Sequence, residues 1–130
     1  MLFKAGDSYE HQFLVSEELY SGFIHLFEDR NPLHTNEDFA QGKGFESRVM
    51  HGNILNGFLS YFIGECLPTK DVIIHTQEIQ YKKPVYLGDQ LDFSATVQDY
   101  YESVQAVVFK YQFKREGVVL AKGKIQIGLI

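Results

Sequence analysis

The sequence contains one cysteine, no tryptophan and three prolines, and it has no long uninterrupted apolar run. Cys66 alone cannot form a disulfide within the chain, which favours a reducing compartment such as the cytoplasm. A membrane-spanning helix needs about 20 apolar residues, whereas the apolar stretch 58–67 is interrupted by Ser60 and Glu65. The N-terminus also lacks the apolar run of a secretory signal. We therefore expect a cytoplasmic protein without a membrane segment.

Positive charge is scarce as well. Twelve Lys and Arg stand against 17 Asp and Glu, which leaves a formal net charge of -5. An acidic chain has no general attraction for phosphate backbones or anionic lipid, so we expect no nucleic-acid partner and no membrane surface. The only adjacent basic pairs are Lys82-Lys83 and Lys114-Arg115, and such pairs usually lie in solvent.

The remaining composition is that of a folded protein. Hydrophobic residues make up 45% of the chain, charged residues 22% and aromatic residues, all Phe and Tyr, 15%. With 130 residues the chain is long enough to bury a core without disulfides. Because it contains no repeat and no linker-like segment, we expect a single domain over residues 1–130.

The first 30 residues predict a strand followed by a helix. Residues 8–15 alternate weakly and end in an apolar run. Ser16, followed by two glutamates, has the pattern of a helix N-cap, and apolar residues then recur at helical spacing as far as Phe27. The helix should end near Asp29, because Pro32 disfavours helical backbone in the residue before it.

Loops and a second long helix are predicted next. The segment 29–34 is expected to be a tight loop, residues 36–41 a short helix capped by Asn36, and residues 45–52 another loop. From 52 to 66 the chain is apolar on nearly every side, a pattern typical of a buried helix.

The second half of the chain predicts strands. Residues 107–113 alternate strictly, with Val, Phe, Tyr and Phe on one face, which indicates a strand with one buried side. Four strands are expected in this half, at 72–81, 91–101, 103–114 and 118–128. The predicted fold class is therefore α+β, with one antiparallel sheet around a buried central helix.

Two clusters could carry chemistry, although their residues alone leave several interpretations open. Asp29, Asn31 and His34 could simply end a helix and turn the chain. His51 could join them as a third metal ligand, but the sequence has neither a Cys pair nor an HExxH motif. Gly52 precedes the apolar helix, where free N–H groups could hold an oxyanion or where a glycine is merely tolerated.

These clusters occur in four fragments with a characteristic order. EDRNPLH at 28–34 is followed by FESRVMHG at 45–52, by the helix that contains Ser60, and by YKKPVYLGDQL at 81–91. In this order they resemble the MaoC-like family of hotdog-fold (R)-specific enoyl-CoA hydratases. The resemblance extends from Ser16 to Phe93, and more loosely to the end of the chain.

The resemblance implies a hotdog fold, in which a curved antiparallel sheet wraps around a long central helix, and a fatty-acyl lyase activity. By position, Asp29 and His34 match the family's catalytic pair, and Gly52 matches the residue whose N–H faces the thioester carbonyl. Ser60 matches a pocket residue and Asn31 a position that orders the active-site loop. The expected reaction interconverts trans-2-enoyl and (R)-3-hydroxyacyl thioesters.

The resemblance also sets expectations for cofactors and partners. No metal and no cofactor is expected, because CoA or the phosphopantetheine of an acyl carrier protein is part of the substrate. A homodimer or a larger homo-oligomer is expected. The chain departs from the family at Phe27, where a small hydroxyl residue is usual, and Ser60 has bulky neighbours in Phe58, Tyr61 and Phe62. The acyl chain length is therefore left open.

Two alternatives use the same fold. In a hotdog thioesterase, a carboxylate such as Asp29 would direct water to the carbonyl carbon. A non-catalytic subunit would only bind acyl thioesters. The histidine five residues after Asp29 favours hydration over both alternatives, because addition of water across a double bond needs an acid as well as a base.

Overall fold

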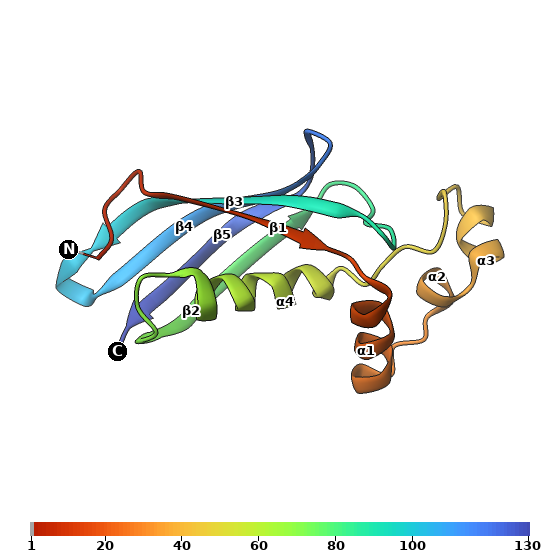
Figure 1. Cartoon of the computed structure of the whole chain (residues 1–130), viewed down its shortest axis with the longest axis horizontal. Helices are drawn as coiled ribbons and strands as arrows, with labels where there is room; N and C mark the ends of the chain where they lie inside the picture. Colours follow the sequence, from red (N-terminus) through yellow and green to blue (C-terminus); the bar gives the residue numbers. More distant parts are fainter. Residues whose placement is uncertain (1) are drawn as a thin grey trace.

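A computed structural model describes residues 2–130 as a curved, five-stranded antiparallel sheet with one helix lying along it (Figure 1). The strand order is β1-β3-β4-β5-β2. The strands are β1 (Ser8–Leu14), β2 (Val72–Tyr81), β3 (Gln90–Tyr101), β4 (Ala106–Arg115) and β5 (Val118–Leu129), and the helices are α1 (Glu17–Phe27), α2 (Pro32–Thr35), α3 (Glu37–Gly42) and α4 (Asn53–Tyr61). This is the α+β arrangement that the sequence predicts.

The core lies between the sheet and α4. The alternation predicted for β4 is confirmed: Val107, Phe109, Tyr111 and Phe113 are buried, and Lys110 is exposed on the opposite face. Phe62, at the end of the central helix, packs edge-on against Phe109, with ring centroids 5.5 Å apart. Burial of these aromatic side chains between the helix and the sheet stabilises the contact between the two.

Only one face of the central helix is buried, whereas the sequence predicts burial all round. Ile54, Leu55, Phe58 and Leu59 face the core. The opposite face of the helix is exposed and carries small or polar side chains at Asn53, Gly57, Ser60 and Gly64. The helix is also shorter than expected, because after Tyr61 the backbone widens into a π-helical turn over Phe62–Cys66.

The first helix begins and ends as the sequence predicts. The Ser16 hydroxyl accepts a hydrogen bond from the N–H of Leu19 at 3.1 Å, as an N-cap does. Glu28, with a φ of 58°, adopts the left-handed conformation at the C-cap. This turn directs the following residue, Asp29, away from the helix axis.

Two local predictions need correction. The segment 29–34 is not a simple loop, because Pro32–Thr35 forms the one-turn helix α2, which Asn31 caps by accepting from the N–H of Leu33. Pro32 occupies the first helical turn, where its missing N–H costs nothing. The fourth strand begins at Ala106 rather than at 103, because residues 102–104 form a 3-10 turn.

Within residues 2–130, no helix has the length and apolar character that crossing a membrane requires.

The turn before β3 is held by Asp89. Gly88 has a φ of 88°, a conformation that favours glycine, and the Asp89 carboxylate accepts from the N–H of Tyr86 and pairs with Arg115. The Asp89 side chain is 13% exposed and that of Arg115 27%, so water screens the pair only partly. The turn follows residues 81–85, which line a cleft together with His34 and Gly52.

We predict that Asp89→Ala lowers the free energy of unfolding by about 1–3 kcal/mol, because it leaves the N–H of Tyr86 without its acceptor and the half-buried guanidinium of Arg115 without its carboxylate partner. Urea titration followed by circular dichroism measures this. Asp92→Ala, at an exposed position on the neighbouring strand, is the control and should change the value by less than about 0.5 kcal/mol. Equal stability of the two variants would contradict the proposed role of the turn.

Candidate active site

Asp29 lies in the short connection between α1 and α2. Its Oδ1 accepts a hydrogen bond from the N–H of Asn31 at 3.2 Å, which restrains the side chain at the start of the turn. The Asp29 side chain is 48% exposed. The carboxylate is therefore anchored through one oxygen, and its Oδ2 points toward His34, the second predicted residue of the pair.

His34 is held by its ring and by its backbone. Nδ1 lies 2.7 Å from the carbonyl oxygen of Val49, and because a carbonyl can only accept, Nδ1 must carry the proton. The backbone carbonyl of His34 accepts from the hydroxyl of Tyr20. The other ring nitrogen, Nε2, is left free to exchange a proton, and it lies 3.7 Å from Oδ2 of Asp29.

His51 joins the two residues, and its role differs from the one that the sequence offered, which was a third metal ligand. It is 3% exposed, and its ring stacks on that of His34, with centroids 3.9 Å apart and planes inclined by 31°. Its Nε2 lies 2.9 Å from the backbone carbonyl of Asp29, so Nε2 carries the proton and Nδ1, which has no partner within residues 2–130, does not. The sequence places this histidine next to the glycine of the helix start, but it does not show the hydrogen bond to Asp29.

The same three side chains could be considered as metal ligands. Asp29, His34 and His51 each offer one potential ligand atom, and these three atoms all lie within 4.8 Å of one another. However, the His51 nitrogen that faces the carboxylate is Nε2, 4.0 Å from Oδ2 of Asp29, and this nitrogen donates to the backbone carbonyl of Asp29. A nitrogen that carries a proton cannot also bind a cation. The hydrogen-bonding pattern therefore fits an acid/base cluster better than a metal site.

Gly52 lies at the beginning of α4. No hydrogen bond formed within residues 2–130 uses its N–H, which is free to donate to a ligand at the positive end of the helix. A Cβ at this position would lie 2.8 Å from the ring of Tyr81. A side chain at position 52 would therefore displace the ring of Tyr81.

The structure brings together Asp29, Asn31, His34 and the start of α4 with Gly52, but it places Ser60 elsewhere. Asn31 acts as the cap of α2 and orders the turn between the two titratable residues. Ser60 is exposed on α4, two turns beyond Gly52, and lines neither of the two clefts that reach the site. Its predicted role as a pocket residue has no support in the cavities of the single chain.

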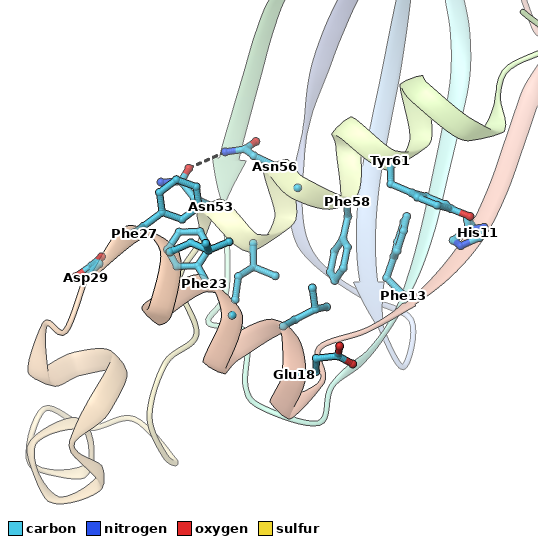
Figure 2. A pocket seen from close by; sticks show the side chains of 15 residues that line it. His11, Phe13, Glu18, Phe23, Phe27, Asp29, Asn53, Asn56, Phe58 and Tyr61 are labelled. Carbon is cyan, nitrogen blue, oxygen red and sulfur yellow. Dashed lines mark hydrogen bonds between the residues drawn. The ribbon is translucent and has the colours of Figure 1, made fainter. Parts of the chain in front are cut away.

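A large apolar groove begins at Asp29 and runs between α1 and α4 (Figure 2). Its volume is about 1210 Å³, and Phe13, Phe23, Phe58 and Tyr61 are among the residues that line it. Figure 2 shows Asp29 at one end and Tyr61 with His11 at the other. This shape and polarity suit an extended apolar chain.

Phe27, the residue at which the sequence departs from the expected pattern, also lines this groove. Its side chain is 69% exposed and lies 4.9 Å, between ring centroids, from Phe23. The position therefore contributes apolar surface beside Asp29 rather than a hydroxyl.

A second, smaller cleft opens on the other side of the pair. Its volume is about 530 Å³, and His34, Gly52, Tyr81, Lys82 and Lys83 are among its lining residues. Asn53 lines both clefts, which therefore meet at the start of α4. A ligand with a reactive group at this junction could extend into both.

Cys66 lies outside this cluster. Burial raises the pKa of its thiol, and the nearby carboxylate of Glu65 raises it further. A thiol with a raised pKa is a poor nucleophile near neutral pH. Cys66 is therefore not a candidate nucleophile.

Together the groups can exchange protons with a bound molecule and polarise a carbonyl. Asp29 can accept a proton, Nε2 of His34 can accept or deliver one, and the Gly52 N–H can stabilise negative charge on an oxygen. The 3.7 Å between the two titratable groups is short enough for both to act on one small substrate group.

Comparison with known proteins agrees with this chemistry. A model of the MaoC like domain matches residues 5–116. An (R)-specific enoyl-CoA hydratase of Rhodospirillum rubrum is 32% identical over 124 residues, 95% of this chain and 86% of that protein. A mitochondrial 3-hydroxyacyl-[acyl-carrier-protein] dehydratase of Arabidopsis thaliana is 29% identical over 90 residues, 69% of this chain and 53% of that protein.

The solved structure of an (R)-hydratase from Aeromonas caviae superimposes with a TM-score of 0.89 at 26% sequence identity. The match covers 98% of each chain. The curved sheet and its central helix therefore have the same arrangement in both proteins.

We predict that the two neutral imidazoles of the site have opposite tautomers, with the proton on Nδ1 in His34 and on Nε2 in His51. The reason is that each of these nitrogens faces a backbone carbonyl. Long-range ¹⁵N–¹H correlation NMR on the histidine-labelled protein distinguishes the tautomers, and His25, exposed on α1, serves as the reference. A proton on Nε2 of His34 in the neutral ring would contradict the assigned geometry.

Proposed function

The chain belongs to the MaoC-like domain family, and on this premise we propose that it is a hydratase/dehydratase that interconverts trans-2-enoyl and (R)-3-hydroxyacyl thioesters. One observation carries the assignment to these residues. Oδ2 of Asp29 and Nε2 of His34 lie 3.7 Å apart at the junction of two clefts, beside the free N–H of Gly52.

In the hydration direction, a water molecule attacks C3 of the enoyl group while the Asp29 carboxylate accepts its proton. The electron pair of the double bond moves to the thioester oxygen, where the Gly52 N–H and the end of the α4 dipole stabilise the enolate. The Nε2–H of protonated His34 then delivers a proton to C2. Dehydration follows the same steps in reverse.

After hydration, Asp29 holds a proton and His34 has lost one. Because the two groups lie 3.7 Å apart, a small movement or one water molecule suffices to return the proton to His34. The anchored Nδ1–H of His34 keeps Nε2 as the nitrogen that exchanges protons throughout the cycle. The pair resets itself without an external base.

This chemistry requires no metal and no redox cofactor, since the carrier, CoA or phosphopantetheine, is part of the substrate. We place the protein in the cytoplasm, as its single cysteine suggests.

We further propose a homodimer formed at the free edge of β2. This strand is bonded to β5 on one side only, and Ile73 and Ile74 on it are 52% and 38% exposed. An exposed edge strand with apolar side chains tends to pair with another strand, and a second copy of β2 would continue the sheet.

We predict that Asp29→Asn and His34→Ala each lower kcat/KM for hydration of crotonyl-CoA by about 10²- to 10⁴-fold, because each removes one proton-transfer group. Loss of ultraviolet absorbance of the enoyl thioester measures hydration. Asp38→Asn and His25→Ala, at exposed helix positions, are matched controls that should keep their activity.

Free thiol is measured in parallel, because its release would identify a thioesterase. Near-normal hydration by both site variants would contradict the acid/base assignment. Binding of enoyl-CoA without turnover by the wild-type protein would instead support a non-catalytic acyl-binding subunit.

We predict that His51→Phe lowers kcat for crotonyl-CoA about tenfold with a smaller effect on KM. The substitution keeps a ring against His34 but removes the hydrogen bond to Asp29, a contribution of about 1 kcal/mol. His51→Gln keeps an N–H donor and should recover part of kcat. If the Gln and Phe variants have the same kcat, His51 acts only through packing.

A further inference from the structure

Lys82 and Lys83 lie in the same cleft as the candidate catalytic histidine. The cleft is lined by both lysines together with His34 and Gly52, and its lining includes no carboxylate. Both side chains are exposed, and no ion pair formed within residues 2–130 involves either of them. In a chain with a net charge of -5, these two lysines concentrate positive charge in the cleft that also holds His34.

The backbone fixes this pair close to the site. The N–H groups of Lys82 and Lys83 both donate to the carbonyl of Leu120, at 2.7 and 3.1 Å. The residue before them, Tyr81, is the one whose ring packs against Gly52. The two ammonium groups are therefore attached to a rigid segment that adjoins the proposed thioester position.

The apolar groove has the opposite character. Its lining contains the carboxylates of Glu18 and Asp29 and no Lys or Arg. A phosphate group in this groove would meet negative charge, whereas an apolar tail would meet aromatic and aliphatic side chains. Of the two clefts that meet at the start of α4, only the one with the lysines suits an anion.

We propose that Lys82 and Lys83 bind the phosphate of the substrate's carrier, so that the pantetheine arm enters through the lysine-lined cleft and the acyl chain occupies the apolar groove. This inference rests on the proposed function, because it takes the thioester to lie beside Gly52. Ammonium groups and phosphate oxygens form charge-assisted hydrogen bonds, which are the strong class in proteins. The phosphate belongs either to CoA or to the phosphopantetheine of an acyl carrier protein.

The test compares crotonyl-CoA with crotonyl-N-acetylcysteamine, a thioester without phosphate. In the double variant Lys82→Ala/Lys83→Ala, we expect the ratio of kcat/KM for crotonyl-CoA to that for the truncated substrate to fall about tenfold, mainly through KM for crotonyl-CoA. The matched control is Lys110→Ala/Lys124→Ala. It removes two exposed lysines that face each other on β4 and β5, and its ratio should stay within about twofold of wild type.

An unchanged ratio in the Lys82/Lys83 variant would overturn the proposal. An equal fall in the control variant would also overturn it, because net charge alone would then explain the effect. An equal loss with both substrates would indicate a structural role for the lysines.

Direct binding of CoA to the wild-type and variant proteins, measured by calorimetry, separates this inference from the proposed function. If the wild-type protein hydrates neither substrate, the proposed function fails, and weaker CoA binding by the Lys82/Lys83 variant would still support the phosphate site. Equal CoA binding by the two proteins would overturn it.

Substrate series then identify the source of the phosphate. A preference for crotonyl-CoA over crotonyl-4′-phosphopantetheine that is lost in the lysine variant assigns the pair to the nucleotide phosphates. A preference for the crotonyl acyl carrier protein that is lost in the same way assigns it to the phosphopantetheine phosphate.

Discussion

The hydrogen bond from His51 to the backbone carbonyl of Asp29 joins two parts of the chain that would otherwise be independent. His51 immediately precedes the central helix, and Asp29 lies in an exposed connection between two other helices. The same imidazole stacks on His34, so one buried ring contacts both candidate proton-transfer residues. Because the ring is almost wholly buried, its own position is determined by the core.

The core in turn depends on the contact between α4 and the sheet. Leu55 and Leu59 on the helix are buried, as are Phe109 and Phe113 on β4. Dense packing leaves the helix little freedom to slide or rotate. The beginning of the helix, with the free N–H of Gly52, is therefore placed accurately relative to the sheet, and Tyr81 on β2 contacts it from the side.

The two clefts at the start of α4 differ in charge in a way that matches the two halves of an acyl thioester. One half of such a molecule is a hydrocarbon chain and the other an anionic carrier, and the thioester lies between them. The groove between α1 and α4 is lined mainly by apolar residues, and the smaller cleft carries Lys82 and Lys83. The two clefts therefore determine the orientation of the bound substrate as well as its position.

Much of this protein follows from local sequence. The alternation in β4 and the cap at Ser16 act over a few residues, so their patterns predict them correctly. The resemblance carried by the segments at 28–34, 45–52 and 81–91 also indicated which residues to consider at the site. The one-turn helix at Pro32 and the exposed face of α4 were missed, since both depend on neighbours that a local pattern does not contain. The role of His51 and the position of Lys82 and Lys83 beside His34 were decided only by the tertiary structure, because hydrogen bonds and clefts join residues that are distant in the chain.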